Sequence, residues 1–127
     1  MRRLMLLRHA KAAPQGALAD ENRPLTGRGR QDMAAIAAFV ASRRLTPDLA
    51  LISPAIRTRE TWDLLLPAFA AAPPHRFDPR LYAASAERIL DLVREISGHI
   101  CQANSPMNPA TRKTAPPSPL TIVVAPT

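Results

Sequence analysis

The chain has 127 residues, a formal net charge of +7 at pH 7, three histidines and a single cysteine. This length is enough for one domain with a buried core, and one cysteine excludes both an intrachain disulfide and a cysteine-rich metal site. No apolar stretch is long enough to cross a bilayer, and charged residues interrupt the first apolar run too early for a signal peptide. We therefore expect a monomeric cytoplasmic protein that does not bind membranes.

The positive charge suits any anionic partner, from a phosphate ester or an acidic phosphoprotein to a nucleic acid. However, the basic residues are spread along the chain rather than gathered on one predicted face, and only one Trp and one Tyr are present for base stacking. A basic nucleic-acid-binding protein is therefore the weaker alternative, and we predict no nucleic-acid partner.

The chain opens with an apolar run over residues 4–7. A continuous run of this kind predicts a central strand that is covered on both faces of a sheet. A loop with Pro and Gly follows over residues 11–24, and Thr26 is then placed to cap a helix that runs to about residue 43. Apolar residues at helical spacing give this helix one buried face.

Two further pairs of a strand and a helix follow. Residues 49–52 form a second apolar strand, and the next helix lies between residues 54 and 67. A third short strand is predicted over residues 75–77, and Ser85 caps a helix whose buried stripe reaches residue 96. Strands that alternate with helices predict an α/β fold with a mainly parallel sheet and helices on both faces.

The character of the chain changes after residue 97. Residues 98–127 contain no acidic residue and six of the fourteen prolines. We therefore divide the chain into a core over residues 1–97 and a divergent, Pro-rich tail over residues 98–127. Residues 120–125 are again an apolar run, which predicts one late strand that can join the centre of the sheet.

The candidate functional residues follow the first two predicted strands. Arg8 and His9 come after the first strand, and Ser53 and Arg57 come after the second. Ligands of such sheets bind beyond the carboxyl ends of the strands, so all four residues are expected at one edge. A guanidinium stays charged and can bind two oxygens at once, and an imidazole can act as a nucleophile. This edge is therefore predicted to be a phosphate site.

Each of these residues also has a plainer interpretation. Arg8 and His9 can be a surface pair, and Arg57 can be a solvated residue on a first helical turn. The convergence of both segments on one sheet edge favours the phosphate site. Ser53 either offers its hydroxyl to phosphate or only ends the strand, and Arg23 either rims the site or lies on the surface.

Several motifs together resemble a known family. The segments L-L-R-H-A at residues 6–10, R-P-L-T-G-R-G-R-Q at 23–31 and S-P-A-I-R-T-R-E-T at 53–61 resemble the histidine phosphatase (phosphoglycerate mutase-like) superfamily. They are most similar to its SixA-type phosphohistidine phosphatases, and D-P-R-L-Y at residues 78–82 matches the same branch. The resemblance covers roughly the first three quarters of the chain, and it is specific because several motifs occur in the right order.

The resemblance implies a phosphatase without a metal or other cofactor, in which His9 attacks phosphorus and becomes a transient phosphohistidine. Arg8 and Arg57 would clamp the phosphoryl oxygens. The implied substrates are phosphohistidine proteins first and small phosphomonoesters second. Glu60 can act as an acid, but its position beside Arg57 and Arg59 favours an ion pair.

The chain departs from the family pattern near its end. Members carry a second catalytic histidine after a late strand, typically in a Gly-His-Asn-Pro setting. Here residues 120–125 are followed by Pro126 and Thr127, and the Gly98-His99 pair follows the third helix instead of a strand. We therefore expect a C-terminally incomplete member, through truncation or a frameshift, with impaired turnover and a partly uncovered apolar sheet. A catalytically inactive phosphate-binding module is the alternative function.

Overall fold

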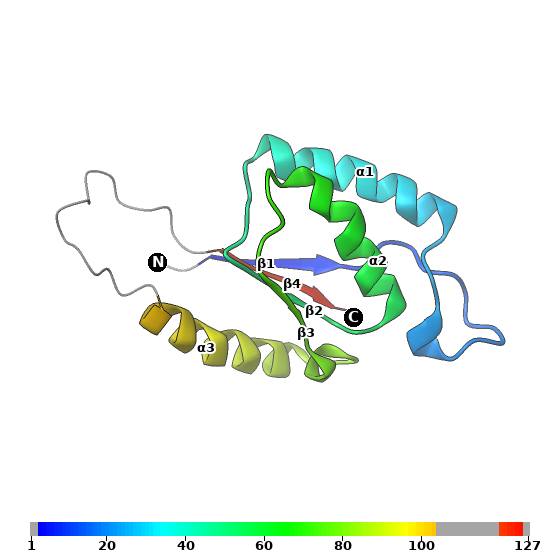
Figure 1. Cartoon of the computed structure of the whole chain (residues 1–127). Helices are drawn as coiled ribbons and strands as arrows, with labels where there is room; N and C mark the ends of the chain where they lie inside the picture. Colours follow the sequence, from blue (N-terminus) through cyan, green and yellow to red (C-terminus); the bar gives the residue numbers. More distant parts are fainter. Residues whose placement is uncertain (1–2, 104–119, 126–127) are drawn as a thin grey trace.

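The computed structural model describes residues 3–103 and 120–125, with side chains described for residues 3–96 and 120–125. Its centre is a four-stranded parallel sheet with the strand order β1-β4-β2-β3 (Figure 1). The strands are β1 (Arg3–Arg8), β2 (Leu49–Ile52), β3 (His75–Phe77) and β4 (Leu120–Ala125). The α-helices are α1 (Gly27–Ser42), α2 (Ile56–Leu65) and α3 (Ala86–Ala103). The first two cover one face of the sheet and α3 covers the other, so the predicted α/β fold is confirmed (Figure 1).

The two central strands supply both layers of the core. Successive side chains on a strand point to opposite faces. Ile52 and Val124 pack with Trp62 beneath α1 and α2, whereas Leu51 and Val123 pack against the apolar stripe of α3. Because both faces are covered, β2 and β4 read as continuous apolar runs rather than as alternating patterns.

Strand β4 lies between β1 and β2 in the sheet. All of its residues are buried, and it pairs with β1 from Arg3 opposite Leu120 to Arg8 opposite Ala125. On its other side it pairs with β2. The late central strand predicted over residues 120–125 is therefore confirmed.

Helix α3 is longer than the pattern predicted. It continues to Ala103, so the boundary after residue 97 does not coincide with the end of an element. Gly98 and His99 lie within this helix rather than after it, which corrects the prediction, and their side chains are outside the described part. The remaining tail over residues 104–119 also lies outside the described residues. No helix in the described segments is both long and apolar enough to span a membrane.

The start of α1 fixes the loop that follows β1. The Thr26 hydroxyl accepts a hydrogen bond from the Gly29 N–H at 3.0 Å, which confirms Thr26 as the helix cap. The same hydroxyl donates to the Lys11 carbonyl at 3.0 Å, and the Thr26 N–H donates to that carbonyl at 2.8 Å. A Cβ atom at Gly29 would collide with the Lys11 carbonyl oxygen. The segment just beyond His9 is therefore held tightly against α1.

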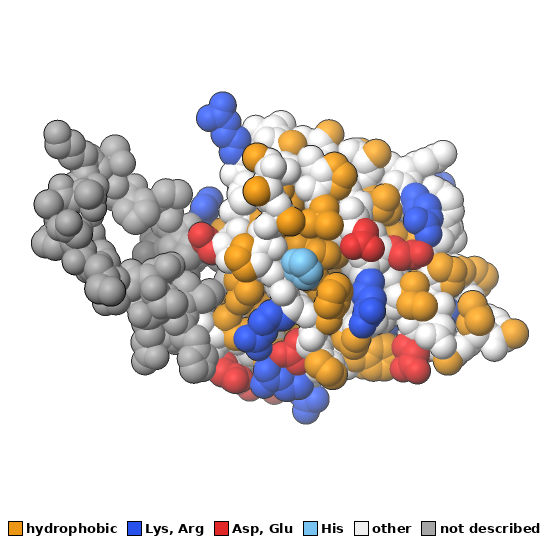
Figure 2. Space-filling view, in the orientation of Figure 1, with side chains coloured by type: hydrophobic (Ala, Val, Ile, Leu, Met, Phe, Trp, Pro, Cys, Tyr) orange, Lys and Arg blue, Asp and Glu red, His pale blue; other side chains and the backbone are white. Residues whose placement is uncertain are grey.

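Charges of both signs are mixed over the surface. On the face seen in Figure 2, Lys and Arg side chains lie among Asp and Glu side chains. Several of these charges are paired, including Arg80 with Asp78 at 2.8 Å and Arg80 with Glu95 at 3.1 Å. The net positive charge is thus not concentrated on this face in the way that a nucleic-acid interface requires.

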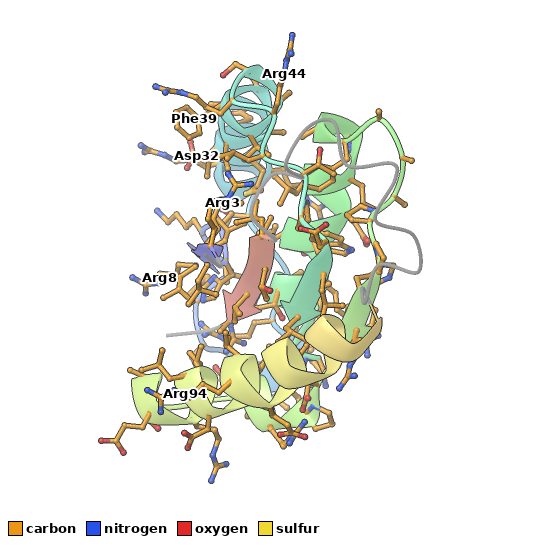
Figure 3. The ribbon with its side chains drawn as sticks, turned by 90° about the vertical axis from the view of Figure 1, so that its left-hand side faces the viewer. Arg3, Arg8, Asp32, Phe39, Arg44 and Arg94 are labelled. Atoms are coloured by element: carbon orange, nitrogen blue, oxygen red, sulfur yellow. The ribbon has the colours of Figure 1, made fainter. Side chains whose placement is uncertain are left out.

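Strand β1 lies at the edge of the sheet, where we had predicted a central strand (Figure 3). Met5 and Leu7 pack against the layer of α1 and α2. On the opposite face Leu4 is 38% exposed and Leu6 is 63% exposed. An apolar run looks the same in sequence whether one or both of its faces are covered, and here only one is. The prediction of full burial for β1 was therefore wrong.

Candidate active site

A cavity of about 780 Å³ opens at the carboxyl edge of the sheet, where β1 ends. In Figure 1 this is the end toward which the strand arrows point. It is lined by Arg8, His9, Ala10, Lys11, Ala12, Arg23, Arg57, Ala83 and Ala84. Four of the five predicted site residues are therefore brought together, and the described lining residues include four cationic side chains and no carboxylate.

One contact of the His9 ring determines which of its two nitrogens carries the proton. Its Nδ1 lies 2.7 Å from the Ala10 carbonyl oxygen, which can only accept, so Nδ1 carries the proton and Nε2 keeps a free lone pair. Partial burial lowers the pKa of His9 below its ordinary value of 6.5. The hydrogen bond to Ala10 opposes this decrease, while the charges of Arg57, Arg8 and Arg23 add to it. At neutral pH the ring is therefore uncharged and nucleophilic.

Arg57 is buried at the first turn of α2 rather than solvated. It is 4% exposed, and its Nη1 donates to the Asp20 carbonyl oxygen at 2.6 Å. Its Nη2 donates to Asp20 Oδ2 at 3.1 Å. The Nε atom is also buried and has no hydrogen-bond partner among the described residues. The buried guanidinium therefore places a fixed positive charge beside the cavity that Arg57 lines.

Arg23, in the loop before α1, also contacts a backbone carbonyl and Asp20 through its outer nitrogens. Its Nη1 donates to the Ala13 carbonyl at 2.9 Å, and its Nη2 forms an ion pair with Asp20 Oδ1 at 3.0 Å. Its Nε is buried and unpartnered within the described part of the chain. Arg23 thus lines the cavity, and the surface alternative does not describe it. Two guanidinium groups that line one cavity make a site that fits an anion with several oxygens.

The two remaining predicted residues differ from each other. Arg8 ends the edge strand, lines the cavity and extends its side chain outward (Figure 3). Ser53 is not among the lining residues, and its side chain is completely buried. Its hydroxyl accepts from the Ala55 N–H at 3.5 Å, and its carbonyl accepts from the Thr58 hydroxyl at 2.7 Å. Ser53 therefore shapes the turn from β2 to α2, and we do not retain it as a phosphate contact.

Glu60 is occupied as an ion-pair partner. Its Oε1 accepts from Arg30 Nη2 at 2.7 Å, and its Oε2 accepts from the Leu25 N–H at 2.6 Å. The ion-pair interpretation was therefore right, although the partner is Arg30 rather than the neighbouring arginines of α2. With both oxygens engaged and no place in the cavity lining, Glu60 is poorly placed to protonate a leaving group.

Three residues that support the site were not predicted. The Thr61 hydroxyl accepts from the Ala10 N–H at 3.1 Å and donates to the Arg57 carbonyl at 2.7 Å, which ties the histidine segment to α2. Asp20 contacts both Arg23 and Arg57, and the Tyr82 hydroxyl donates to it at 2.7 Å. The spacing of Asp20 three residues before Arg23 was the one local signal available.

A parallel sheet with an imidazole and arginines at its carboxyl edge defines a phosphoglycerate mutase-like α/β protein. The family model of the histidine phosphatase superfamily (branch 1) matches residues 4–105, and the chain belongs to this superfamily. The solved structure of the candidate phosphohistidine phosphatase SixA from Agrobacterium tumefaciens is 28% identical, with a TM-score of 0.75. The alignment covers 98% of this chain and 68% of that one.

Two further relatives differ more in length. The candidate phosphohistidine phosphatase SixA from Nakamurella multipartitia is 26% identical with a TM-score of 0.66, and 99% of this chain covers 59% of it. An uncharacterized chloroplastic protein of Arabidopsis thaliana is 39% identical over 89 residues, which are 67% of this chain and 40% of the relative. The chain therefore spans less than half the length of this curated relative.

Proposed function

We propose that this chain is a phosphatase that acts through a covalent phosphohistidine intermediate on His9. The observation that carries the proposal is the position of a neutral imidazole in a cavity lined by four cationic side chains. A tetrahedral oxyanion carries a negative charge and several acceptor oxygens, so it matches a cavity lined by cationic side chains.

The first step forms a bond between His9 Nε2 and phosphorus as the bond from phosphorus to the leaving group breaks. The electron pair of the broken bond stays with the leaving group, which takes up a proton from water. Arg8 and Arg57 compensate the negative charge on the phosphoryl oxygens. Water then attacks phosphorus, the electron pair of the nitrogen–phosphorus bond returns to Nε2, and inorganic phosphate departs. The Ala10 carbonyl holds the Nδ1 proton throughout.

The favoured substrate class is a protein phosphorylated on histidine. No carboxylate is among the described residues that line the cavity, and both oxygens of Glu60 are already engaged. Without a positioned acid, a leaving group that departs easily reacts best, and an imidazole departs more easily than an alkoxide. Small phosphomonoesters are the second class.

Binding of phosphate without turnover is the second candidate function. It is favoured by a separate observation, namely that His9 is the one histidine among the described residues that line the cavity. A single imidazole and its arginines are sufficient to hold an oxyanion. Turnover of a substrate with a poor leaving group requires in addition that the leaving group and the attacking water be assisted from the opposite side.

The deciding experiment traps the intermediate. The protein is mixed with a phosphohistidine peptide or an aryl phosphate and tested for an acid-labile phosphoenzyme. We expect the phosphoenzyme to form in the wild type and in a His75→Gln control, because His75 lies on β3 outside the cavity. We expect none in His9→Gln. A phosphoenzyme in His9→Gln would overturn the assignment of the intermediate to His9. Vanadate binding without a phosphoenzyme selects the binding module, and the absence of both excludes both functions.

A further inference from the structure

One carboxylate joins two arginines of the site, the buried Arg57 and the partly exposed Arg23. Asp20 lies in the short 3-10 helix η1 (Asp20–Asn22). Its Oδ1 is 3.0 Å from Arg23 Nη2, and its Oδ2 is 3.1 Å from Arg57 Nη2. Its backbone carbonyl accepts from Arg57 Nη1 at 2.6 Å. Asp20 therefore binds both outer nitrogens of Arg57 and one outer nitrogen of Arg23.

Asp20 is itself held by Tyr82, which follows the 3-10 helix η3 (Pro79–Leu81) on the far side of the site. The Tyr82 hydroxyl donates to Asp20 Oδ2 at 2.7 Å across 62 residues of sequence. This hydrogen bond and the contact with Arg57 lower the pKa of Asp20, so it is a carboxylate at neutral pH and not a proton donor. The same hydrogen bond raises the pKa of Tyr82, which keeps the hydroxyl protonated.

The contacts with Asp20 fix the orientation of the Arg57 guanidinium group. The Arg57 side chain is 5% exposed, and a buried guanidinium is stable only with a counter-charge and hydrogen-bond partners. With two of its nitrogens tied to one residue, its planar group cannot turn about its long side chain. A group that is already oriented loses less conformational freedom when a ligand binds.

We infer that Asp20, held by Tyr82, is a positioning residue that orients Arg23 and Arg57 for a phosphoryl group. This inference rests on the proposed function, since it assigns the orientation of the same anion site. The same contacts are compatible with the opposite role, in which the Asp20 carboxylate competes with the phosphoryl oxygens for the two arginines. The two roles predict opposite changes in anion affinity when the carboxylate is neutralised.

The test compares vanadate affinity, measured by calorimetry, in Asp20→Asn, Tyr82→Phe and Glu21→Gln. Glu21 is the control, because it lies in the same turn and its replacement removes the same charge without a described hydrogen bond or ion pair. We expect Asp20→Asn to weaken vanadate binding by about 10- to 100-fold, as the loss of an outer orienting partner typically does. Tyr82→Phe weakens it by a smaller factor, and Glu21→Gln changes it by less than about twofold.

Two further results separate positioning from general stability. Tyr82 acts through Asp20, so adding Tyr82→Phe to Asp20→Asn is expected to cause little further loss of affinity. Asp20→Glu keeps the charge and is expected to recover part of the affinity. If Asp20→Asn does not fold, the Tyr82→Phe variant alone decides, because it removes only one hydroxyl.

The outcomes distinguish the two proposals. A wild-type chain that binds no vanadate overturns the proposed function and this inference with it. A wild-type chain that binds, together with Asp20→Asn and Tyr82→Phe variants that bind equally well, overturns only the positioning role. Tighter binding by Asp20→Asn overturns it as well, because that result identifies the carboxylate as a competitor.

Discussion

The replacement Thr61→Val tests whether α2 holds the histidine segment. The Thr61 side chain is completely buried, and valine has nearly its shape. The variant loses the acceptor for the Ala10 N–H at 3.1 Å and the donor to the Arg57 carbonyl at 2.7 Å. Leaving a buried N–H unpaired costs about 1–3 kcal/mol, so we expect the free energy of unfolding to fall by about 2 kcal/mol. For a chain of this length the melting temperature falls by roughly 5–10 °C.

The same variant should weaken function, because the Ala10 carbonyl fixes the His9 ring. A small displacement of a reacting group lowers kcat/KM strongly, and we expect about a tenfold decrease or more. Stability is measured by urea unfolding followed through Trp62, the single tryptophan, which is buried. Thr61→Ser is the matched control, since it keeps the hydroxyl and loses only a methyl group. The reasoning is refuted if Thr61→Val is as stable as Thr61→Ser and binds vanadate like the wild type.

Three other measurements check separate features. Gly29→Ala should destabilise the protein by about 1–3 kcal/mol in urea unfolding, because the new Cβ meets a backbone carbonyl, whereas Gly27→Ala, with open space around it, should not. Ala83 has a φ of 51° and is exposed, so Ala83→Gly should stabilise by about 0.5–1 kcal/mol, whereas destabilisation would contradict the strain. The pKa of His9 lies below 6.5 in the folded chain, so the unfolded chain takes up a proton first as the pH falls. Stability should therefore decrease on acidification through pH 6.5, and His9→Asn should show a weaker decrease over the same range.

The elements of the fold were predictable because each has a local signal. Apolar runs marked β1, β2 and β4, the turn at Asp78 and Pro79 marked the end of the short β3, and Thr26 marked the start of α1. The order of the strands has no such signal, since β4 reaches β1 across most of the chain. For this reason β1 was predicted as central, although Leu6 on its outer face is exposed.

The site was predictable where it depends on strand ends and not where it depends on distant contacts. Arg8, His9 and Arg57 follow two strands of a parallel sheet, and this topology alone brings them to one edge. Asp20 and Tyr82 meet across 62 residues, between loops without periodicity, so no pattern connects them. A serine after a strand looks the same whether its hydroxyl faces a ligand or, as in Ser53, the backbone.

The position of β4 has a consequence for how the protein assembles. Among the described strands it follows β1, β2 and β3 along the chain, yet β1 and β2 are joined in the sheet only through it. The contact between β4 and β1 closes a long loop of chain, which slows folding and leaves β1 without its partner strand until β4 has been synthesised. Arg8 and His9 at the end of β1 and Arg57 beyond β2 thus reach their final register only when β4 has inserted between them. Any ligand that bridges the two segments would stabilise the sheet in which β4 lies between β1 and β2.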